Sequence, residues 1–101
     1  MFFKRIPSIS TKELEGKMKN KPLIIDVRSS AEFKGGHIPG AKNVPLQKIE
    51  QFEPKGSCYV ICASGMRSKR AAKLLKANGY EATNVTGGMS RWQGPVKGGN
   101  Y

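Results

Sequence analysis

The sequence predicts an α/β domain built around a mainly parallel sheet. Residues 23–27 and 58–61 form two apolar runs, and the first is apolar at nearly consecutive positions, which is typical of a strand buried on both faces. Segments with capping signals or helical spacing alternate with the predicted strands, as in repeated β-α-β units. The 101 residues suffice for one hydrophobic core, so we expect a single domain over residues 1–101.

The first half of the chain predicts two short helices, each opened by a capping box. Ser10-Thr11-Lys12-Glu13 begins an amphipathic helix that ends at Asn20-Lys21-Pro22. Ser29-Ser30-Ala31-Glu32 is the second box, and it begins a helix through Phe33 that Gly35-Gly36 stops. The first apolar run lies between the two helices and predicts a buried strand.

The rest of the chain predicts three further strands and three helical segments. We expect a turn at 37–41, strands at 42–44, 58–61 and 82–85, and helical segments at 46–52, 69–78 and 89–92. The last residues, from Gly94 onward, are rich in glycine. We therefore expect the domain core to span about residues 5–94, with residues 95–101 forming a flexible tail.

The composition excludes some classes of protein. Lys and Arg number 18 against 7 Asp and Glu, giving a net charge of +11, which favours an anionic substrate or an acidic partner. Nucleic-acid binding is not expected, because the aromatic residues are not interleaved with the basic ones. No apolar run approaches the ~20 residues that span a bilayer. Lys4 and Arg5 interrupt the apolar start, so we expect no signal peptide, no membrane contact and a cytoplasmic location.

The two cysteines, Cys58 and Cys62, are predicted to remain free thiols. On one strand, at ~3.3 Å per residue, their Cα atoms lie roughly 13 Å apart. A disulfide requires less than about 7 Å, so pairing would break the strand. This indicates a reducing compartment, and we interpret Cys58 as a packing residue.

The chain is organised around Cys62-Ala63-Ser64-Gly65-Met66-Arg67-Ser68, which joins a predicted strand to a predicted helix. Unpaired amides converge at the start of a helix and favour thiolate over thiol. Gly65 permits positive φ, so the backbone can curl round the sulfur, and Arg67 adds a permanent cation that we expect to face the pocket. We therefore predict an ionised, exposed sulfur at Cys62.

Two other segments are predicted to meet this loop at one edge of the sheet. Asp26-Val27-Arg28 ends one strand and Gly87-Gly88 follows another, and sites in parallel sheets form beyond the carboxyl ends of the strands. We interpret Asp26 and Arg28 as residues that support the site structurally. His37 is the only histidine, so we expect no metal site and no cysteine–histidine hydrolase.

Four motifs in register resemble those of the single-domain rhodaneses, also called thiosulfate sulfurtransferases. They are Asp26-Val27-Arg28, Gly36-His37-Ile38-Pro39-Gly40-Ala41 with Asn43-Val44-Pro45, the Cys62–Ser68 loop, and Gly87-Gly88 with Trp92. The resemblance covers about residues 5–94. It implies a rhodanese-like three-layer sandwich, in which a five-stranded, mainly parallel sheet carries helices on both faces.

The resemblance also implies transfer of a sulfane sulfur. Cys62 matches the family's persulfide-forming cysteine. The substrate-binding residues implied are those that complete the loop, namely Ala63, Ser64, Gly65, Met66, Arg67 and Ser68. The donor would be thiosulfate or another sulfane-sulfur compound, the acceptor a thiol, cyanide or a protein, and no cofactor is needed because cysteine carries the atom.

Besides a purely structural or sensory domain, in which Cys62 would be unreactive, two alternatives remain open at this point. One is a sulfur relay or binding module that docks an acidic protein through its basic residues. The other is a phosphatase or arsenate reductase, since arginine suits oxyanions. Four residues separate Cys62 from Arg67, and loops of the tyrosine-phosphatase type have one more, so this second alternative is the minor one.

Overall fold

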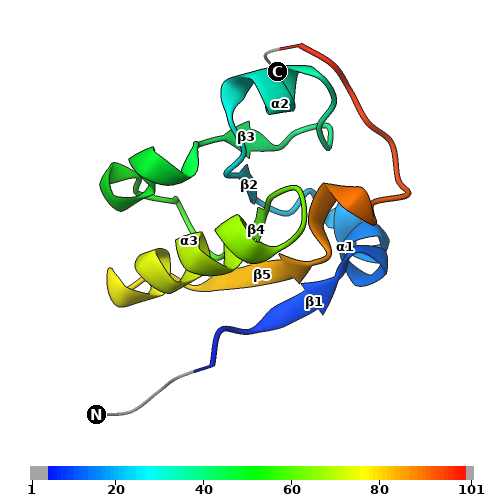
Figure 1. The fold of residues 1–101 in the computed structure, drawn as a ribbon. Helices are drawn as coiled ribbons and strands as arrows, with labels where there is room; N and C mark the ends of the chain where they lie inside the picture. Colours follow the sequence, from blue (N-terminus) through cyan, green and yellow to red (C-terminus); the bar gives the residue numbers. More distant parts are fainter. Residues whose placement is uncertain (1–4, 100–101) are drawn as a thin grey trace.

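Five parallel strands form the sheet at the centre of the protein, in the spatial order β1-β5-β4-β2-β3 (Figure 1). The computed structural model describes residues 5–99. The strands are β1 (Ser8–Ser10), β2 (Ile24–Asp26), β3 (Lys42–Asn43), β4 (Cys58–Ile61) and β5 (Ala82–Thr86). The predicted α/β class and five-stranded parallel sheet are confirmed.

Helices cover both faces of this sheet. The α-helices are α1 (Thr11–Lys17), α2 (Ser30–Lys34) and α3 (Met66–Ala77), and the 3-10 helices are η1 (Met18–Asn20), η2 (Leu46–Gln51) and η3 (Gly88–Ser90). Within residues 5–99, no helix is both long enough and apolar enough to cross a membrane.

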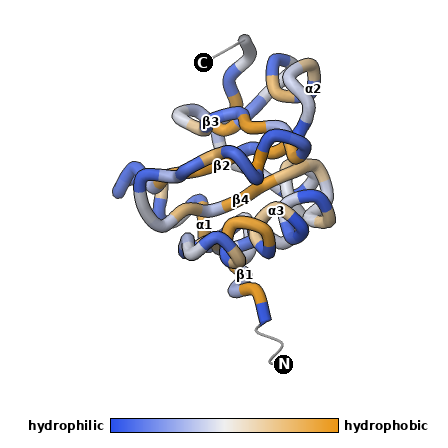
Figure 2. Tube along the Cα trace, turned by 90° about the vertical axis from the view of Figure 1, so that its left-hand side faces the viewer, coloured by the Kyte–Doolittle hydropathy of each residue, from blue (hydrophilic) through white to orange (hydrophobic). Residues whose placement is uncertain are grey.

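The hydrophobic core is divided by the sheet into two clusters. Successive residues of a strand point to opposite faces, so Ile25 packs with Leu75 of α3 while Ile24 packs with Leu14 of α1. In Figure 2, where the backbone is coloured by hydropathy, the orange of hydrophobic residues follows the central strand β4. The two clusters establish three layers and explain why residues 23–25 and Val27 are all apolar.

Both predicted capping boxes are present. The Glu13 amide donates to Ser10 Oγ at 3.0 Å, and the Ser10 amide donates to the Glu13 carboxylate at 3.2 Å. The Glu32 amide donates to Ser29 Oγ at 3.2 Å, and the Ser29 amide donates to Glu32 Oε1 at 3.0 Å. The second box fixes the Glu32 carboxylate at the start of α2, where it becomes important for the site.

Three elements differ from the sequence expectation. Strand β1 was not expected; it pairs with β5 at the sheet edge and has one partly buried residue, Ile9, between two exposed serines. The segment at 46–52 forms the 3-10 helix η2. Helix α3 begins at Met66, three residues earlier than expected. Strand β4 ends at Ile61 as predicted, so Cys62 is the first residue of the loop.

Residues 95–99 are bound to the body of the protein, in contrast to the flexible tail expected. His37 and Lys97 exchange backbone hydrogen bonds of 2.9 and 2.8 Å, and the Gly99 amide donates to the Lys34 carbonyl at 3.0 Å. Trp92 Nε1 donates to the Pro95 carbonyl at 2.9 Å. Apart from the Trp92 side chain, these contacts join backbone groups, which a glycine-rich sequence does not reveal. Residues 100–101 lie outside the described part.

Candidate active site

Cys62 lies where β4 ends and the loop to α3 begins, at the carboxyl edge of the sheet. Gly65 precedes α3 with φ 110°, a left-handed conformation that only glycine adopts without strain. This conformation turns the Gly65 amide back toward the sulfur, 3.0 Å from Cys62 Sγ. The predicted positive φ at Gly65 is confirmed.

The loop after β5 supports the cysteine loop from one side. The Met89 amide donates to the Cys62 carbonyl at 2.8 Å, and the Ser90 amide donates to the Ala63 carbonyl at 2.9 Å. A Cβ at Gly88 would collide with the Cys62 carbonyl. Glycine is therefore required at this position, because the two backbone segments lie so close together. The predicted meeting of the Gly87-Gly88 turn and the cysteine loop is therefore observed.

The environment of Cys62 favours its thiolate. Burial by itself raises the pKa of this thiol. Hydrogen bonds from the Ser68 hydroxyl and from the amides of Ser68, Gly65 and Ser64 together lower the pKa by more than burial raises it. The resulting pKa of Cys62 lies below its ordinary value of 9.0. Cys58 has only the burial effect, which raises its pKa to about 11. Of the two free cysteines, Cys62 is thus the one whose surroundings favour the thiolate, which is the nucleophilic form.

The sulfur is not exposed, contrary to expectation. Cys62 is 1% exposed and belongs to the core cluster that α3 covers. The loop that supplies its hydrogen bonds also encloses it, since amides at 3 Å from an atom exclude water from that side. Ala63 and Gly65 are partly exposed and Ser64 is exposed, so they form the outer surface of the loop. A reactant must therefore reach the sulfur between these backbone groups.

Ser68 and Asn84 lie on the inner side of the sulfur. Ser68 Oγ is 3.4 Å from Cys62 Sγ, 2.6 Å from Asn84 Oδ1 and 3.1 Å from the Gly65 carbonyl. A hydroxyl has one hydrogen, so it donates to only one of these at a time: to Asn84 beside a thiol, and to Cys62 beside a thiolate. Ser68 is fully buried and contacts the sulfur from the interior.

The sequence analysis missed Asn84. It occupies a buried position on β5 between Thr83 and Val85, where a polar side chain requires a partner. Because β5 also contains two threonines, an asparagine in this strand gave little signal in the sequence.

Arg67 does not point freely into a pocket, which corrects the expectation for this residue. Its guanidinium forms a bidentate pair with Glu32 of α2, with Nη1 at 2.8 Å from Oε1 and Nη2 at 2.9 Å from Oε2. The Arg67 hydrogen bonds lower the pKa of Glu32 to about 2. The pair joins the first turn of α3 to the capped start of α2.

Asp26 and Arg28 form a buried ion pair next to the site. Arg28 Nη2 donates to Asp26 Oδ2 at 2.8 Å and to the Gly36 carbonyl at 2.7 Å. Asn43 Nδ2 donates to the carbonyls of Asp26 and Arg28 at 3.0 and 2.9 Å. These contacts hold the end of β2 against β3 and the turn at His37.

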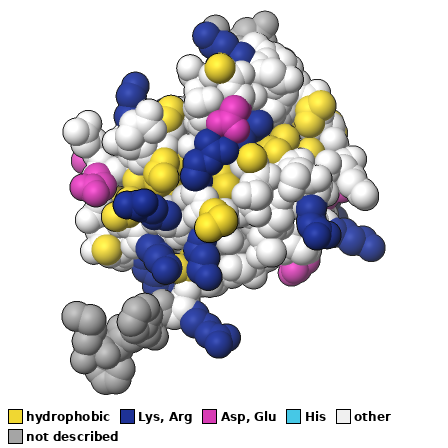
Figure 3. All heavy atoms as spheres, viewed as in Figure 1, with side chains coloured by type: hydrophobic (Ala, Val, Ile, Leu, Met, Phe, Trp, Pro, Cys, Tyr) yellow, Lys and Arg dark blue, Asp and Glu magenta, His cyan; other side chains and the backbone are white. Residues whose placement is uncertain are grey.

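The outer surface beside the loop is basic with an apolar centre. Met66 is 80% exposed at the start of α3 and lines a hollow of about 390 Å³ with Gly65, Lys69, Arg70 and Lys73. Lys and Arg side chains gather over the part of the surface where Figure 1 places α3 (Figure 3).

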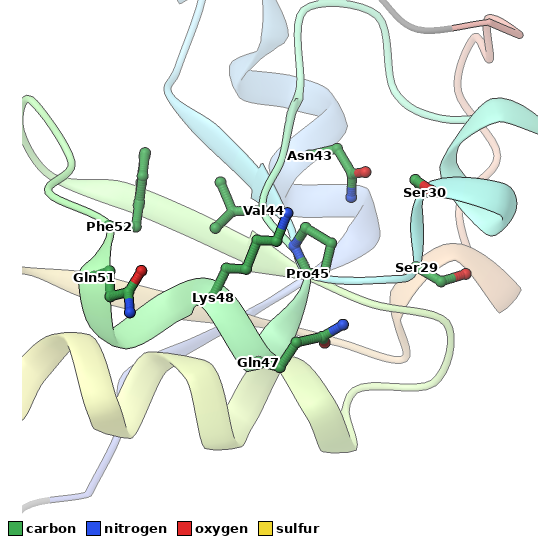
Figure 4. Close-up of a pocket in the computed structure, with 9 residues that line it drawn as sticks. All are labelled: Ser29, Ser30, Asn43, Val44, Pro45, Gln47, Lys48, Gln51 and Phe52. Atoms are coloured by element: carbon green, nitrogen blue, oxygen red, sulfur yellow. The ribbon is translucent and has the colours of Figure 1, made fainter.

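A larger pocket of about 570 Å³ lies at the ends of β2 and β3 (Figure 4). It is lined by Ser29, Ser30, Asn43, Val44, Pro45, Gln47, Lys48, Gln51 and Phe52. In the part of the chain that the structure describes, no three His, Cys, Asp or Glu side chains are grouped to hold a metal ion.

A parallel sheet between two helical layers, with a cysteine held by backbone amides at a strand-to-helix loop, defines a class of cysteine-centred α/β domains. The rhodanese-like domain family matches residues 10–95, and the chain belongs to that family.

Similar proteins include a named sulfurtransferase. The putative sulfurtransferase YtwF of Bacillus subtilis is 36% identical over 98 residues, covering 91% of this chain and 95% of YtwF. The uncharacterized protein YqhL of the same organism is 42% identical over 82 residues, covering 76% of this chain. The chain matches 65% of the length of YqhL and 54% of the putative sulfur carrier protein YrkF.

Solved structures are similar over most of the chain. The crystal structure of a rhodanese-like domain protein from Staphylococcus aureus has a TM-score of 0.83 at 38% identity. The matched region covers 93% of this chain and 99% of the Staphylococcus aureus chain. This likeness extends beyond the cysteine loop to the whole three-layer arrangement.

Proposed function

We propose that the protein is a sulfurtransferase that carries a sulfane sulfur on Cys62. The observation that carries the proposal is the set of hydrogen bonds aimed at Cys62 Sγ, from Gly65 at 3.0 Å and from the other donors of the loop. Donors fixed around a sulfur stabilise negative charge there without reorganising during the reaction. The name of the relative YtwF agrees with this chemistry.

The reaction has two steps when thiosulfate is the donor. The Cys62 thiolate forms a bond to the outer sulfur, the sulfur–sulfur bond of thiosulfate breaks, and sulfite leaves with that electron pair. The terminal sulfur of the Cys62 persulfide then carries the negative charge. An acceptor such as cyanide or a thiol attacks this sulfur and restores the thiolate, and no metal or organic cofactor takes part.

Turnover with a small donor and acceptor tests this function. The protein is mixed with thiosulfate and cyanide, and thiocyanate is measured for the wild type, Cys62→Ser and Cys58→Ser. We expect turnover in the wild type and in Cys58→Ser, because Cys58 is a buried packing residue with a raised pKa. Turnover that survives in Cys62→Ser would contradict the proposal.

A sulfur relay between proteins is the second candidate, and the surface around Met66 favours it. A methionine that is 80% exposed beside three cations offers an apolar contact with a charged rim. An acidic protein that carries a persulfide fits this surface, since charge complementarity speeds encounter. Transfer from such a protein would slow strongly with added salt, whereas turnover of a small neutral donor would change little.

Phosphatase or arsenate reductase activity has less support. The loop is one residue shorter than phosphatase loops, and the guanidinium that would bind the oxyanion is occupied by Glu32. We expect no hydrolysis of aryl phosphates by the wild-type protein.

A further inference from the structure

We propose that Glu32 sets the donor preference of the Cys62 site, by holding Arg67 and so disfavouring doubly charged donors relative to singly charged ones. This inference rests on the proposed sulfur transfer and adds a residue that selects its substrate. The observation that carries it is the bidentate pair, in which both oxygens of Glu32 engage the guanidinium at 2.8 and 2.9 Å.

Arg67 lies between Gly65 and Ser68, which contact Cys62 Sγ at 3.0 and 3.4 Å, so its charge acts beside the sulfur. Hydrogen bonding to Glu32 is the main cause that raises the pKa of Arg67, and the neighbouring Cys62 thiolate contributes to the same direction. An unpaired guanidinium at this place would attract an incoming anion, and it would attract a dianion about twice as strongly as a monoanion. With Glu32 attached, the guanidinium and carboxylate charges cancel.

Glu32 is held in this position by the helix that carries it. Its Oε1 also accepts a hydrogen bond from the Ser29 amide at 3.0 Å. The capping box of α2 therefore fixes the position of the carboxylate independently of Arg67. Its pKa of about 2 keeps it ionised at any pH where the thiolate forms. The side chains of Arg67 and Glu32 are 39% and 36% exposed, so a small anion can reach the guanidinium once it is released.

The chain offers a matched control for a substitution at Glu32. Glu13 occupies the same position in the capping box of α1, and α1 and α3 pack against opposite faces of the sheet. Glutamine also caps from this position, so Glu32→Gln and Glu13→Gln both preserve the helix start. They differ in that only Glu32→Gln removes the charge opposite Arg67.

Two donors that differ by one charge isolate the effect. Thiosulfate is a dianion, and methanethiosulfonate is a monoanion in which a methyl group replaces one oxygen. In both, the Cys62 thiolate bonds to the outer sulfur and the sulfur–sulfur bond breaks. The leaving group takes the electron pair as sulfite in one case and as methanesulfinate in the other, so the chemistry at Cys62 is the same.

The experiment compares kcat/KM for the two donors, with cyanide as acceptor, in the wild type and both variants. We expect the ratio of thiosulfate to methanethiosulfonate to rise roughly fivefold in Glu32→Gln, the size of effect typical of a partly exposed charge. The ratio should stay at the wild-type value in Glu13→Gln. In the double variant Glu32→Gln/Arg67→Gln it should return toward the wild-type value, since both charges are then absent.

The possible failures are distinguishable. A ratio that stays at the wild-type value in Glu32→Gln, with both donors turned over, overturns the inference and leaves the sulfurtransferase function intact. An equal rise in Glu13→Gln also overturns it, because the effect would then come from overall charge. If the wild type turns over neither donor and Cys62 gains no sulfur, the proposed function fails and this inference fails with it.

Discussion

The backbone amide of Gly65 donates a 3.0 Å hydrogen bond to the sulfur of Cys62. This contact exists because Gly65 takes a positive φ, which reverses the chain direction three residues after the cysteine. Ser68, in the first turn of α3, contacts the same sulfur from the interior of the protein. The cysteine is therefore enclosed by its own loop and helix, and the chemistry depends on their conformation.

Replacing Gly65 by alanine should impair sulfur transfer more than folding. Alanine at φ 110° is strained, and its Cβ would lie 3.3 Å from the Gly87 amide nitrogen. We expect a loss of about 1–3 kcal/mol in the free energy of unfolding and at least a tenfold lower rate of Cys62 loading. Gly79→Ala is the matched control, because Gly79 also has positive φ but no atom within 4 Å of the added Cβ. Equal loading rates in the two variants would contradict this prediction.

Replacing Ser68 by alanine should raise the pKa of Cys62. The change removes a hydroxyl that hydrogen-bonds the sulfur and leaves the buried Asn84 without this partner, which costs about 1–3 kcal/mol of stability. The pH dependence of Cys62 alkylation, measured in a Cys58→Ser background, should shift to higher pH. Ser57→Ala, an exposed site, provides the control. An unchanged midpoint in Ser68→Ala would show that the hydroxyl does not stabilise the thiolate.

The two cysteines should separate in an alkylation titration of the native protein. The pKa of Cys62 lies below 9.0, whereas that of Cys58 is raised to about 11. Because the folded pKa of Cys58 exceeds its unfolded value of 9.0, its contribution to stability is complete below pH 9 and is lost as the pH rises through 11. Peptide mapping after brief alkylation at mildly alkaline pH should find the label at Cys62. A label mainly at Cys58 would contradict the assignment.

The Glu32–Arg67 pair should stabilise the protein at neutral pH and fail in acid. The folded pKa of Glu32 is about 2 and its unfolded value 4.5, so the contribution is complete above pH 4.5 and is lost as the pH falls through 2. The pair is more than a third exposed, so we expect less than about 1 kcal/mol. Urea unfolding of the wild type and Glu32→Gln should differ at pH 6 and converge near pH 2. A difference that persists unchanged in acid would contradict this.

Much of the fold could be predicted because its signals are local. Both capping boxes are four-residue patterns, and consecutive apolar residues mark a strand buried on two faces. Strand β1 could not be found in the same way, because three residues with one inward side chain carry no recognisable period. The attachment of residues 95–99 depends on backbone hydrogen bonds, which are independent of side-chain type.

Contacts within the candidate site could be predicted where the residues are close in sequence, and were missed where they are distant. Gly65 lies three positions from Cys62, and its role followed from the loop alone. Glu32 lies 35 positions from Arg67, and Asn84 lies 16 from Ser68, so only the folded chain brings each pair together. The burial of Cys62 was also missed. The loop amides that favour a thiolate also surround the sulfur, and the core residues that cover it come from distant parts of the chain.

Intact mass measurement tests the central role of Cys62 most directly. The purified protein is incubated with thiosulfate, freed of excess donor and weighed before and after addition of cyanide. The mass should increase by one sulfur atom in the wild type, return to its starting value with cyanide, and remain constant in Cys62→Ser. A folded wild-type protein that gains no sulfur, or a Cys62→Ser variant that gains it equally, would contradict the assignment.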